Sequence, residues 1–225
     1  HAWQKLLAMA STEAQDFDYC YWIDADIFIN PSAPDPIHTI DTKKISVTVE
    51  SGSPHSQEPT AIKSIWLKAY KESNEGIPWE SRGYYENYGF QSKNRPLFNT
   101  GMVGFSPKKH AHFFKDVYSR WEEGGPGTLW EMIPLNLAIQ AKQYQILDPK
   151  YNRVAFPWSC AWSWPKTRKT TNALLDAREN ASTEEEFICQ IFKKSYFLHL
   201  AGASPERFEK YSIIINNLIK QSGNH

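Results

Sequence analysis

The spacing of hydrophobic residues changes from helical to strand-like near the start of the chain. Apolar side chains at Trp3, Leu6, Leu7 and Ala10 recur three and four residues apart, which predicts an amphipathic helix. The run YCYWIDADIFI at residues 19–29 is almost continuously apolar, as is typical of a strand covered on both faces of a sheet. This run predicts a single buried strand, which ends at the Asn-Pro pair that follows it.

The rest of the chain alternates between strand-like and helical patterns. We predict strands at 43–51, 97–105, 144–148 and 195–202, and helices at 61–73, 107–123, 129–142 and 205–221. Such alternation is typical of an α/β protein whose mixed, mostly parallel sheet is flanked by helices. The length of 225 residues fits a single domain over 1–225 with a sizeable core.

Composition and charge exclude several classes of protein. Hydrophobic residues make up 41% and charged residues 22%, which is typical of a globular chain. The formal net charge is zero, so no basic excess favours a nucleic-acid partner. No apolar run is long enough for a transmembrane segment. Cys20, Cys160 and Cys189 have no CxxC spacing, which disfavours structural zinc but leaves a Cys160–Cys189 disulfide open.

Two acids interrupt the apolar run at 19–29. Asp24 and Asp26 are two residues apart, so in a strand they would share one face at a separation of roughly 7 Å. A hard divalent cation with oxygen ligands would offset both charges. The alternative is that both acids have left the strand and hydrogen-bond the turn that leads into Asn30.

A metal-dependent phosphohydrolase of the haloacid-dehalogenase type also places an acid pair after an apolar strand. That pattern requires Thr or Val two residues after the second acid, where this chain has Phe28. It also requires a downstream acidic pair, and the sequence contains no Asp-Asp. The phosphohydrolase is therefore the weaker metal-dependent alternative.

Three other segments are interpreted from their residues alone. Ser106 and Pro107 predict an N-cap followed by Pro at the first helical position. His110 and His112 point in different directions on that helix, and we interpret them as surface residues. The Trp-rich segment 157–165 is either an acceptor-sugar platform or a loop packed on the core.

Four segments, in the same order, resemble segments of GT-A-type glycosyltransferases. WIDADIFINP is similar to their metal-binding DxD segment, and FNTGMVGFSPKKH to the Asn-x-Gly strand of the family 8 enzymes. LWEMIPLNLAI and FLHLAG resemble the later helix and the His-x-x-Gly segment of that family. The opening HAWQKLLAM is similar to the related family 34 enzymes. The resemblance implies a GT-A fold, but without its first N-terminal strand-helix units.

The resemblance also implies a set of site residues. Asp24, Asp26 and His199 would bind Mn²⁺ or Mg²⁺, and the mixed carboxylate and imidazole set suits Mn²⁺. Glu131 and Asp24 would have catalytic roles. The residues expected to bind the donor are Asn99, Thr100, Gly101, Asn136 and Gly202.

The implied activity is transfer of a sugar, with retention, from a nucleotide-sugar donor to a hydroxyl group. A UDP-sugar is the favoured donor, and a carbohydrate or glycoconjugate is the acceptor. The alternative is a non-catalytic sugar-binding domain on the same scaffold. The expected location is the cytoplasm, or the Golgi lumen if the chain is part of a longer protein. One departure concerns Gly202, which precedes Ala203 and Ser204 where family 8 enzymes have Lys-Pro, so Arg207 is the candidate substitute for that Lys.

Overall fold

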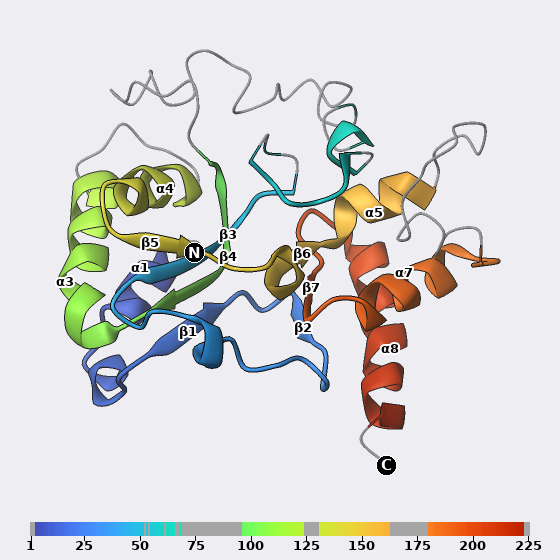
Figure 1. The fold of residues 1–225 in the computed structure, drawn as a ribbon, viewed down its shortest axis with the longest axis horizontal. Coiled ribbons are helices and arrows are strands. Elements are labelled where there is room, and N and C mark those ends of the chain that lie inside the picture. Colours follow the sequence, from blue (N-terminus) through green and yellow to red (C-terminus); the bar gives the residue numbers. More distant parts are fainter. Residues whose placement is uncertain are drawn as a thin grey trace.

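The structure is a computed structural model that describes residues 3–222 apart from 52, 54, 61, 66–67, 69–95, 124–130 and 163–179. Within the described residues, strands form two sheets with helices beside each of them (Figure 1). The expected α/β class with mixed sheets and flanking helices is therefore confirmed.

The first sheet has four strands in the order β1-β4-β3-β5. These strands are β1 (Cys20–Ile23), β3 (Ile45–Val49), β4 (Phe98–Phe105) and β5 (Tyr144–Ile146). Strand β4 is antiparallel to both β1 and β3, whereas β3 and β5 are parallel. The register between β3 and β4 shifts between Val47 and Thr48, which pair with Val103 and Asn99. The β4 residues 100–102 therefore lie at an irregularity of the β3–β4 ladder.

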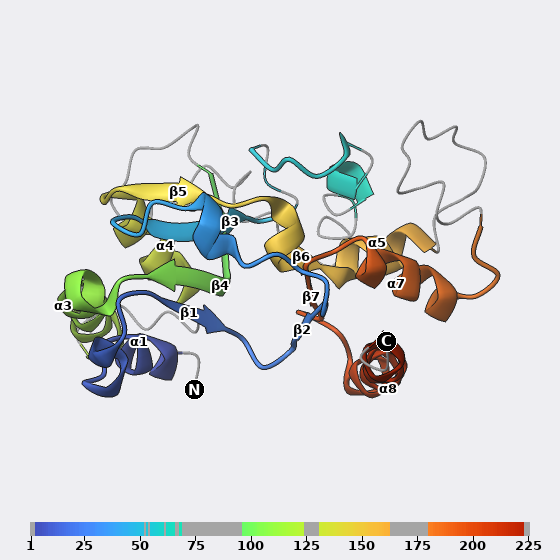
Figure 2. The same ribbon diagram turned by 60° about the horizontal axis from the view of Figure 1, so that its bottom comes forward.

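The second sheet has three short strands in the order β2-β7-β6. These strands are β2 (Ile27–Ile29), β6 (Arg153–Val154) and β7 (Phe197–His199). Strand β7 is antiparallel to β2 and parallel to β6. The chain passes directly from β1 in the first sheet to β2 in the second (Figure 2).

Two groups of helices flank the sheets. Helices α1 (Gln4–Met9), α3 (Pro107–Tyr118) and α4 (Met132–Gln140) lie beside the four-stranded sheet, on the left of Figure 1. Helices α5 (Ala155–Trp162), α7 (Glu184–Lys193) and α8 (Pro205–Ser222) lie beside the three-stranded sheet, on the right. Short 3₁₀-helices occupy Glu13–Asp16, Pro36–Thr39 and Pro149–Asn152, and a π-helical turn occupies Ser119–Glu123.

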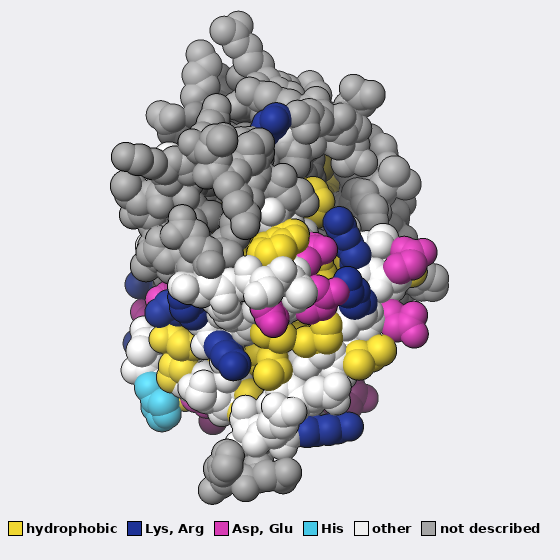
Figure 3. Space-filling model, turned by 90° about the vertical axis from the view of Figure 1, so that its right-hand side faces the viewer, with side chains coloured by type: hydrophobic (Ala, Val, Ile, Leu, Met, Phe, Trp, Pro, Cys, Tyr) yellow, Lys and Arg dark blue, Asp and Glu magenta, His cyan; other side chains and the backbone are white. Residues whose placement is uncertain are grey.

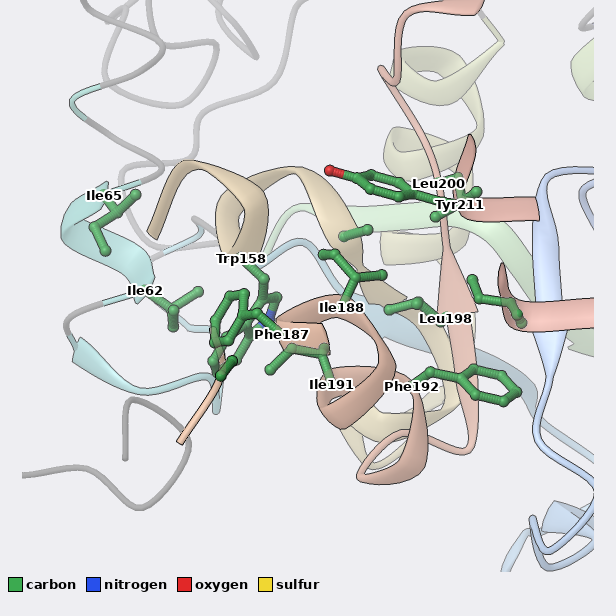
Figure 4. Close-up of a cluster of buried hydrophobic side chains, with 13 residues drawn as sticks. Ile62, Ile65, Trp158, Phe187, Ile188, Ile191, Phe192, Leu198, Leu200 and Tyr211 are labelled. Carbon is green, nitrogen blue, oxygen red and sulfur yellow. The ribbon is translucent and has the colours of Figure 1, made fainter. Parts of the chain in front are cut away.

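Each helix group encloses its own hydrophobic core. The core on the right contains Trp158 and Phe187, which are fully buried, together with Ile188, Ile191 and Leu198 (Figure 4). Burying an aromatic side chain of this kind contributes roughly 1.5–3 kcal/mol. Trp158 is therefore a core residue in a helix and not part of a sugar platform, and residues 163–165 of the Trp-rich segment lie outside the described residues.

The prediction of one strand over 19–29 is wrong. The chain turns after Ile23, where the Asp24 backbone N–H donates to the Gly101 carbonyl and the Ile27 N–H donates to the Asp24 carbonyl. Strand β2 then pairs with β7 in the other sheet. Asp24 and Asp26 thus lie in a turn, which corresponds to the alternative in which both acids leave the strand.

The expected mostly parallel pairing is also wrong, because three of the five described strand pairings are antiparallel. Continuous burial had indicated parallel strands. All eight residues of the central strand β4 are buried although both of its neighbours are antiparallel to it. Coverage of both faces therefore explains the continuous burial without determining whether neighbouring strands are parallel or antiparallel.

Of the helix predicted at 61–73, the described residues 62–65 and 68 are helical.

The described surface carries both signs of charge. On the side that presents α7 and α8, Lys and Arg side chains are interspersed with Asp, Glu and hydrophobic side chains (Figure 3).

Cys20 and Cys189 are free thiols, so the Cys160–Cys189 bridge does not form. No helix in the described ranges combines the length and apolar character needed to cross a bilayer.

Candidate metal and donor-sugar site

The acid turn lies where the two sheets meet. Its backbone is fixed from both sides, because Asp24 N–H donates to the Gly101 carbonyl over 2.8 Å and Leu200 N–H donates to the Asp26 carbonyl over 2.9 Å. Strand β4 thus holds one end of the turn, and the residue after β7 holds the other. Both carboxylates are partly buried, and the turn aims them at the end of β7.

The structure brings the three predicted metal ligands together. The ligand atoms of Asp24, Asp26 and His199 all lie within 4.8 Å of one another. His199 is 4% exposed, and its Nε2 lies 3.2 Å from Asp26 Oδ1. Burial raises the pKa of Asp26, but the hydrogen bond and charge of a positively charged His199 ring, a backbone hydrogen bond and the charge of Lys5 together outweigh burial and lower it. Two carboxylates and an imidazole at this spacing form a donor set that fits a divalent cation.

Lys5 is a site residue that the sequence analysis missed. Its Nζ lies 2.6 Å from Glu131 Oε1 and 3.2 Å from Asp24 Oδ1, and it donates to the Thr100 carbonyl over 3.3 Å. The side chain is only 7% exposed. The sequence did contain a signal for Lys5, because it lies one turn before Met9 on the apolar face of the first helix. A Lys on a buried face requires an anionic partner.

Asp24 has partners other than a metal. Trp22 Nε1 donates to Asp24 Oδ1 over 2.6 Å, and Lys5 contacts both oxygens of the carboxylate. Asp24, Asp26 and Glu131 carry three negative charges as carboxylates against the one positive charge of Lys5. The cluster is therefore left with two net negative charges, which a divalent cation would neutralise.

Glu131 lies directly before helix α4, as predicted, but it does not cap that helix with its side chain. Its carboxylate is buried, paired with Lys5, and accepts a hydrogen bond from Thr100 Oγ1 over 3.1 Å. Thr100 and Glu131 therefore join β4 to the start of α4 on the Lys5 side of the site.

Asn99 and Gly101 contact the metal-ligand side of the site. Asn99 Oδ1 accepts from the Gly101 N–H over 2.9 Å, and Asn99 Nδ2 donates to Glu50 Oε2 over 2.7 Å. A Cβ atom on Gly101 would lie 2.3 Å from Cε1 of His199. The missing side chain of Gly101 therefore makes room for the imidazole ring of His199.

The two remaining predicted donor residues lie in different environments. Asn136 is 0% exposed, and its amide is taken by backbone groups: it accepts from Phe98 N–H over 2.6 Å and donates to the carbonyls of Phe98 and Met132. Asn136 thus supports the start of β4. Gly202 is exposed after β7 with a φ of 73°, a conformation that favours glycine.

Two further buried residues, Glu50 and Asn152, were also missed. Asn152 Oδ1 lies 2.9 Å from His199 Nδ1, and Asn152 Nδ2 donates to Asn99 Oδ1 over 2.8 Å. Burial raises the pKa of Glu50, while hydrogen bonds from Asn99 and the Ser51 N–H act in the opposite direction. The acid at the end of the alternating 43–51 pattern was a signal for Glu50, whereas nothing in the sequence distinguished Asn152.

Solved structures with a similar fold are glycosyltransferases. No family model matches the sequence, and no curated protein matches it. Among solved structures, the chain resembles a glycosyltransferase involved in the glycosylation of the major capsid of PBCV-1, with a TM-score of 0.51 at 14% identity. It also resembles the galactosyltransferase LgtC in complex with donor and acceptor sugar analogs, with the same TM-score and identity. The chain has a GT-A-like glycosyltransferase fold.

Both similarities extend over nearly the whole chain. They cover 94% of it against the first structure and 96% against LgtC, and they span 75% and 66% of those two proteins. At 14% identity this likeness concerns the glycosyltransferase fold, and the roles of individual residues depend on the geometry described above.

Proposed function

We propose that the chain is a metal-dependent glycosyltransferase. It would move a sugar, with retention, from a nucleotide-sugar donor, with a UDP-sugar favoured, to a hydroxyl group of a carbohydrate or glycoconjugate. The observation that carries the proposal is the cluster of Asp24, Asp26 and His199, which has the donor atoms and the charge for a divalent cation. The glycosyltransferase fold supports sugar transfer as the reaction class.

Asp24, Asp26 and His199 would hold Mn²⁺ or Mg²⁺, with Mn²⁺ favoured by the imidazole ligand. When bound, the ion supplies a Lewis acid that offsets the negative charge of the departing nucleoside diphosphate. Lys5 and Trp22 orient Asp24, because three hydrogen bonds from their nitrogen atoms end on its carboxylate. Asp26 accepts no comparable set of contacts within the described residues, and its Oδ1 lies 3.2 Å from His199 Nε2.

The other predicted residues take roles that follow from their contacts. Glu131, oriented by Lys5 and Thr100, would stabilise the donor sugar at the reacting carbon. Asn99, Thr100 and Gly101 would form the wall of the donor site at the irregular part of β4. Asn136 would act through β4, because its amide is already bonded to the strand backbone.

The loop after His199 would approach the donor diphosphate. Gly202 has open space around it, so a phosphate could lie against its backbone. Arg207 lines a small depression with Leu200, Ala201 and Ala203, which places it beside this loop. We propose Arg207 as the cation that replaces the missing Lys of the family 8 pattern.

The proposal is tested by the Asp26→Asn substitution in a donor-hydrolysis and transfer assay with UDP-sugars and Mn²⁺. Loss of a ligand charge removes several kcal/mol of charge stabilisation, so we expect turnover to fall more than about 100-fold. The exposed Asp18, which pairs with Lys108 on the surface, provides the control: Asp18→Asn should retain wild-type turnover. Unchanged turnover in Asp26→Asn would contradict the proposed metal site.

One observation favours a non-catalytic sugar-binding domain as the second candidate. Glu131 is buried and already neutralised by Lys5, so the carboxylate has a structural partner without a substrate. This candidate predicts Mn²⁺-dependent binding of UDP-sugars with no release of UDP for any donor and acceptor. Detectable UDP release that requires Mn²⁺ would eliminate it.

A further inference from the structure

A chain of buried hydrogen bonds runs from Glu50 to His199. Glu50 Oε2 accepts from Asn99 Nδ2 over 2.7 Å, and Asn99 Oδ1 accepts from Asn152 Nδ2 over 2.8 Å. Asn152 Oδ1 then lies 2.9 Å from His199 Nδ1. All four residues are buried, and they come from four separate segments: the residue after β3, strand β4, the 3₁₀-helix before β6, and β7.

The orientation of the first amide is fixed by an unambiguous donor. The backbone N–H of Gly101 donates to one side-chain atom of Asn99 over 2.9 Å, and that atom must therefore be the oxygen. The Nδ2 group of Asn99 then faces Glu50, whose second oxygen accepts from the Ser51 N–H. Glu50 thus supplies the acceptor that completes this arrangement.

The orientation of the second amide follows from the first. Because the oxygen of Asn99 faces Asn152, the atom of Asn152 that meets it must be Nδ2. The same Nδ2 donates to Thr48 Oγ1 over 3.0 Å. The oxygen of Asn152 is therefore the atom that faces the imidazole ring of His199.

This orientation determines which nitrogen of His199 carries hydrogen. Nδ1 faces an amide oxygen, so Nδ1 is the donor, and in the neutral ring Nε2 then carries the lone pair. That lone pair points toward Asp26 Oδ1 at 3.2 Å. A lone pair facing a carboxylate oxygen is repulsive unless a cation lies between them or the ring takes up a proton.

We propose that Glu50, Asn99 and Asn152 form a positioning relay that fixes His199 as the Nδ1–H tautomer and so presents the Nε2 lone pair to a divalent cation. The metal part rests on the proposed function, whereas the tautomer is a property of the metal-free protein. Without the relay, Nε2–H would donate to Asp26, and the ring could bind a metal only after losing that hydrogen.

The test combines two readouts on the purified chain. Nitrogen NMR of the metal-free protein at about pH 8.5, where an unperturbed imidazole is neutral, reports which ring nitrogen of His199 carries hydrogen. Mn²⁺ titration by calorimetry reports the Kd. The test variant is Asn152→Leu, which has similar volume but no acceptor for Nδ1–H. The matched control is Thr48→Val, which removes another buried hydrogen bond of Asn152 but leaves Asn99 to orient it.

Wild type and Thr48→Val should both show the Nδ1–H tautomer and similar Kd values. Asn152→Leu should shift His199 to the Nε2–H tautomer and raise the Mn²⁺ Kd about 10- to 100-fold. An Nε2–H tautomer in wild type, or an unchanged tautomer and Kd in Asn152→Leu, would overturn the relay. If wild type binds no Mn²⁺, the proposed function fails, and the tautomers of the metal-free proteins still decide for or against the relay.

Discussion

At the scale of single residues, the two acids of the turn differ in how their charge is offset. Asp24 is bonded to Lys5 and to the indole N–H of Trp22, so its charge is stabilised within the protein. Within the described residues, Asp26 has one ion-pair partner, the imidazole of His199, whose Nε2 lies 3.2 Å from Asp26 Oδ1. The unmet charge of the site is therefore concentrated at Asp26 and His199, and anything that displaces the His199 ring should weaken metal binding.

Gly101→Ala provides a direct test of that displacement. The new Cβ would lie 2.3 Å from His199 Cε1, so the ring must move, and we expect Mn²⁺ affinity to fall at least about 10-fold in calorimetry. Gly104→Ala is the matched control, because Gly104 lies on the same strand as Gly101. Its new Cβ would crowd Tyr19 and Tyr21 without touching His199. Both variants should lose thermal stability. Equal Mn²⁺ affinities in the two variants would contradict the role assigned to Gly101.

At the scale of elements, local patterns predicted where helices and strands occur but not how the acid turn forms. The alternating pattern at 43–51 corresponds to β3, and the helical pattern at 205–221 corresponds to α8. The break between β1 and β2 escaped prediction, because both flanks are apolar and β2 pairs with a strand about 170 residues later in the chain. The deciding hydrogen bonds, to Gly101 and Leu200, are tertiary contacts.

The start of α3 shows a similar mixture. Ser106 is the N-cap residue and Pro107 is the first helical residue, as predicted, but the Ser106 side chain makes no capping bond. Instead, the backbone N–H of Ser106 donates to His110 Nδ1 over 3.1 Å. His110 therefore lies at the surface only in part, because its ring is partly buried and accepts a hydrogen bond at the helix start.

His110 should make stability pH-dependent. Burial, with the charges of Lys109 and Lys142, lowers its pKa, so between its folded pKa and about 6.5 the unfolded chain binds a proton that the folded chain does not. The free energy of unfolding should therefore fall as the pH drops below about 6.5. Urea titrations across this range should show that the free energy of unfolding depends less on pH in His110→Gln than in wild type. His112 is exposed, so the control variant His112→Gln should show the wild-type pH dependence. Identical pH slopes in wild type and His110→Gln would refute this account.

At the scale of the whole molecule, the site joins the two sheets. Asp24 follows β1 of the first sheet, whereas Asp26 directly precedes β2 and His199 is the last residue of β7 in the second. Asn152, one of the residues that sequence analysis missed, bridges this junction, because it contacts Asn99 of β4 and His199 of β7. Lys5, which was also missed, joins α1 to Asp24 and Glu131 on the side of the first sheet. Their partners are distant in sequence, so their roles follow from how the sheets pack and from no local pattern.

A cation at this junction should raise thermal stability. A ligand at 100 times its Kd stabilises the folded state by about 2.7 kcal/mol, which corresponds to a Tm increase of about 5–10 °C for a chain of this size. Differential scanning calorimetry with and without Mn²⁺ should show this increase in wild type and its reversal by EDTA. Asp18→Asn should keep the increase. An increase of the same size in Asp26→Asn would show that the ion binds elsewhere.

Metal-dependent binding of the donor nucleotide is tested by calorimetric titration of UDP into the chain with Mn²⁺ and, separately, with EDTA. We expect saturable UDP binding that requires Mn²⁺, is retained in Asp18→Asn and is lost in Asp26→Asn, because Asp26 and His199 would hold the cation that offsets the charge of the diphosphate. UDP binding that is absent with Mn²⁺, or equally strong in EDTA, would contradict it.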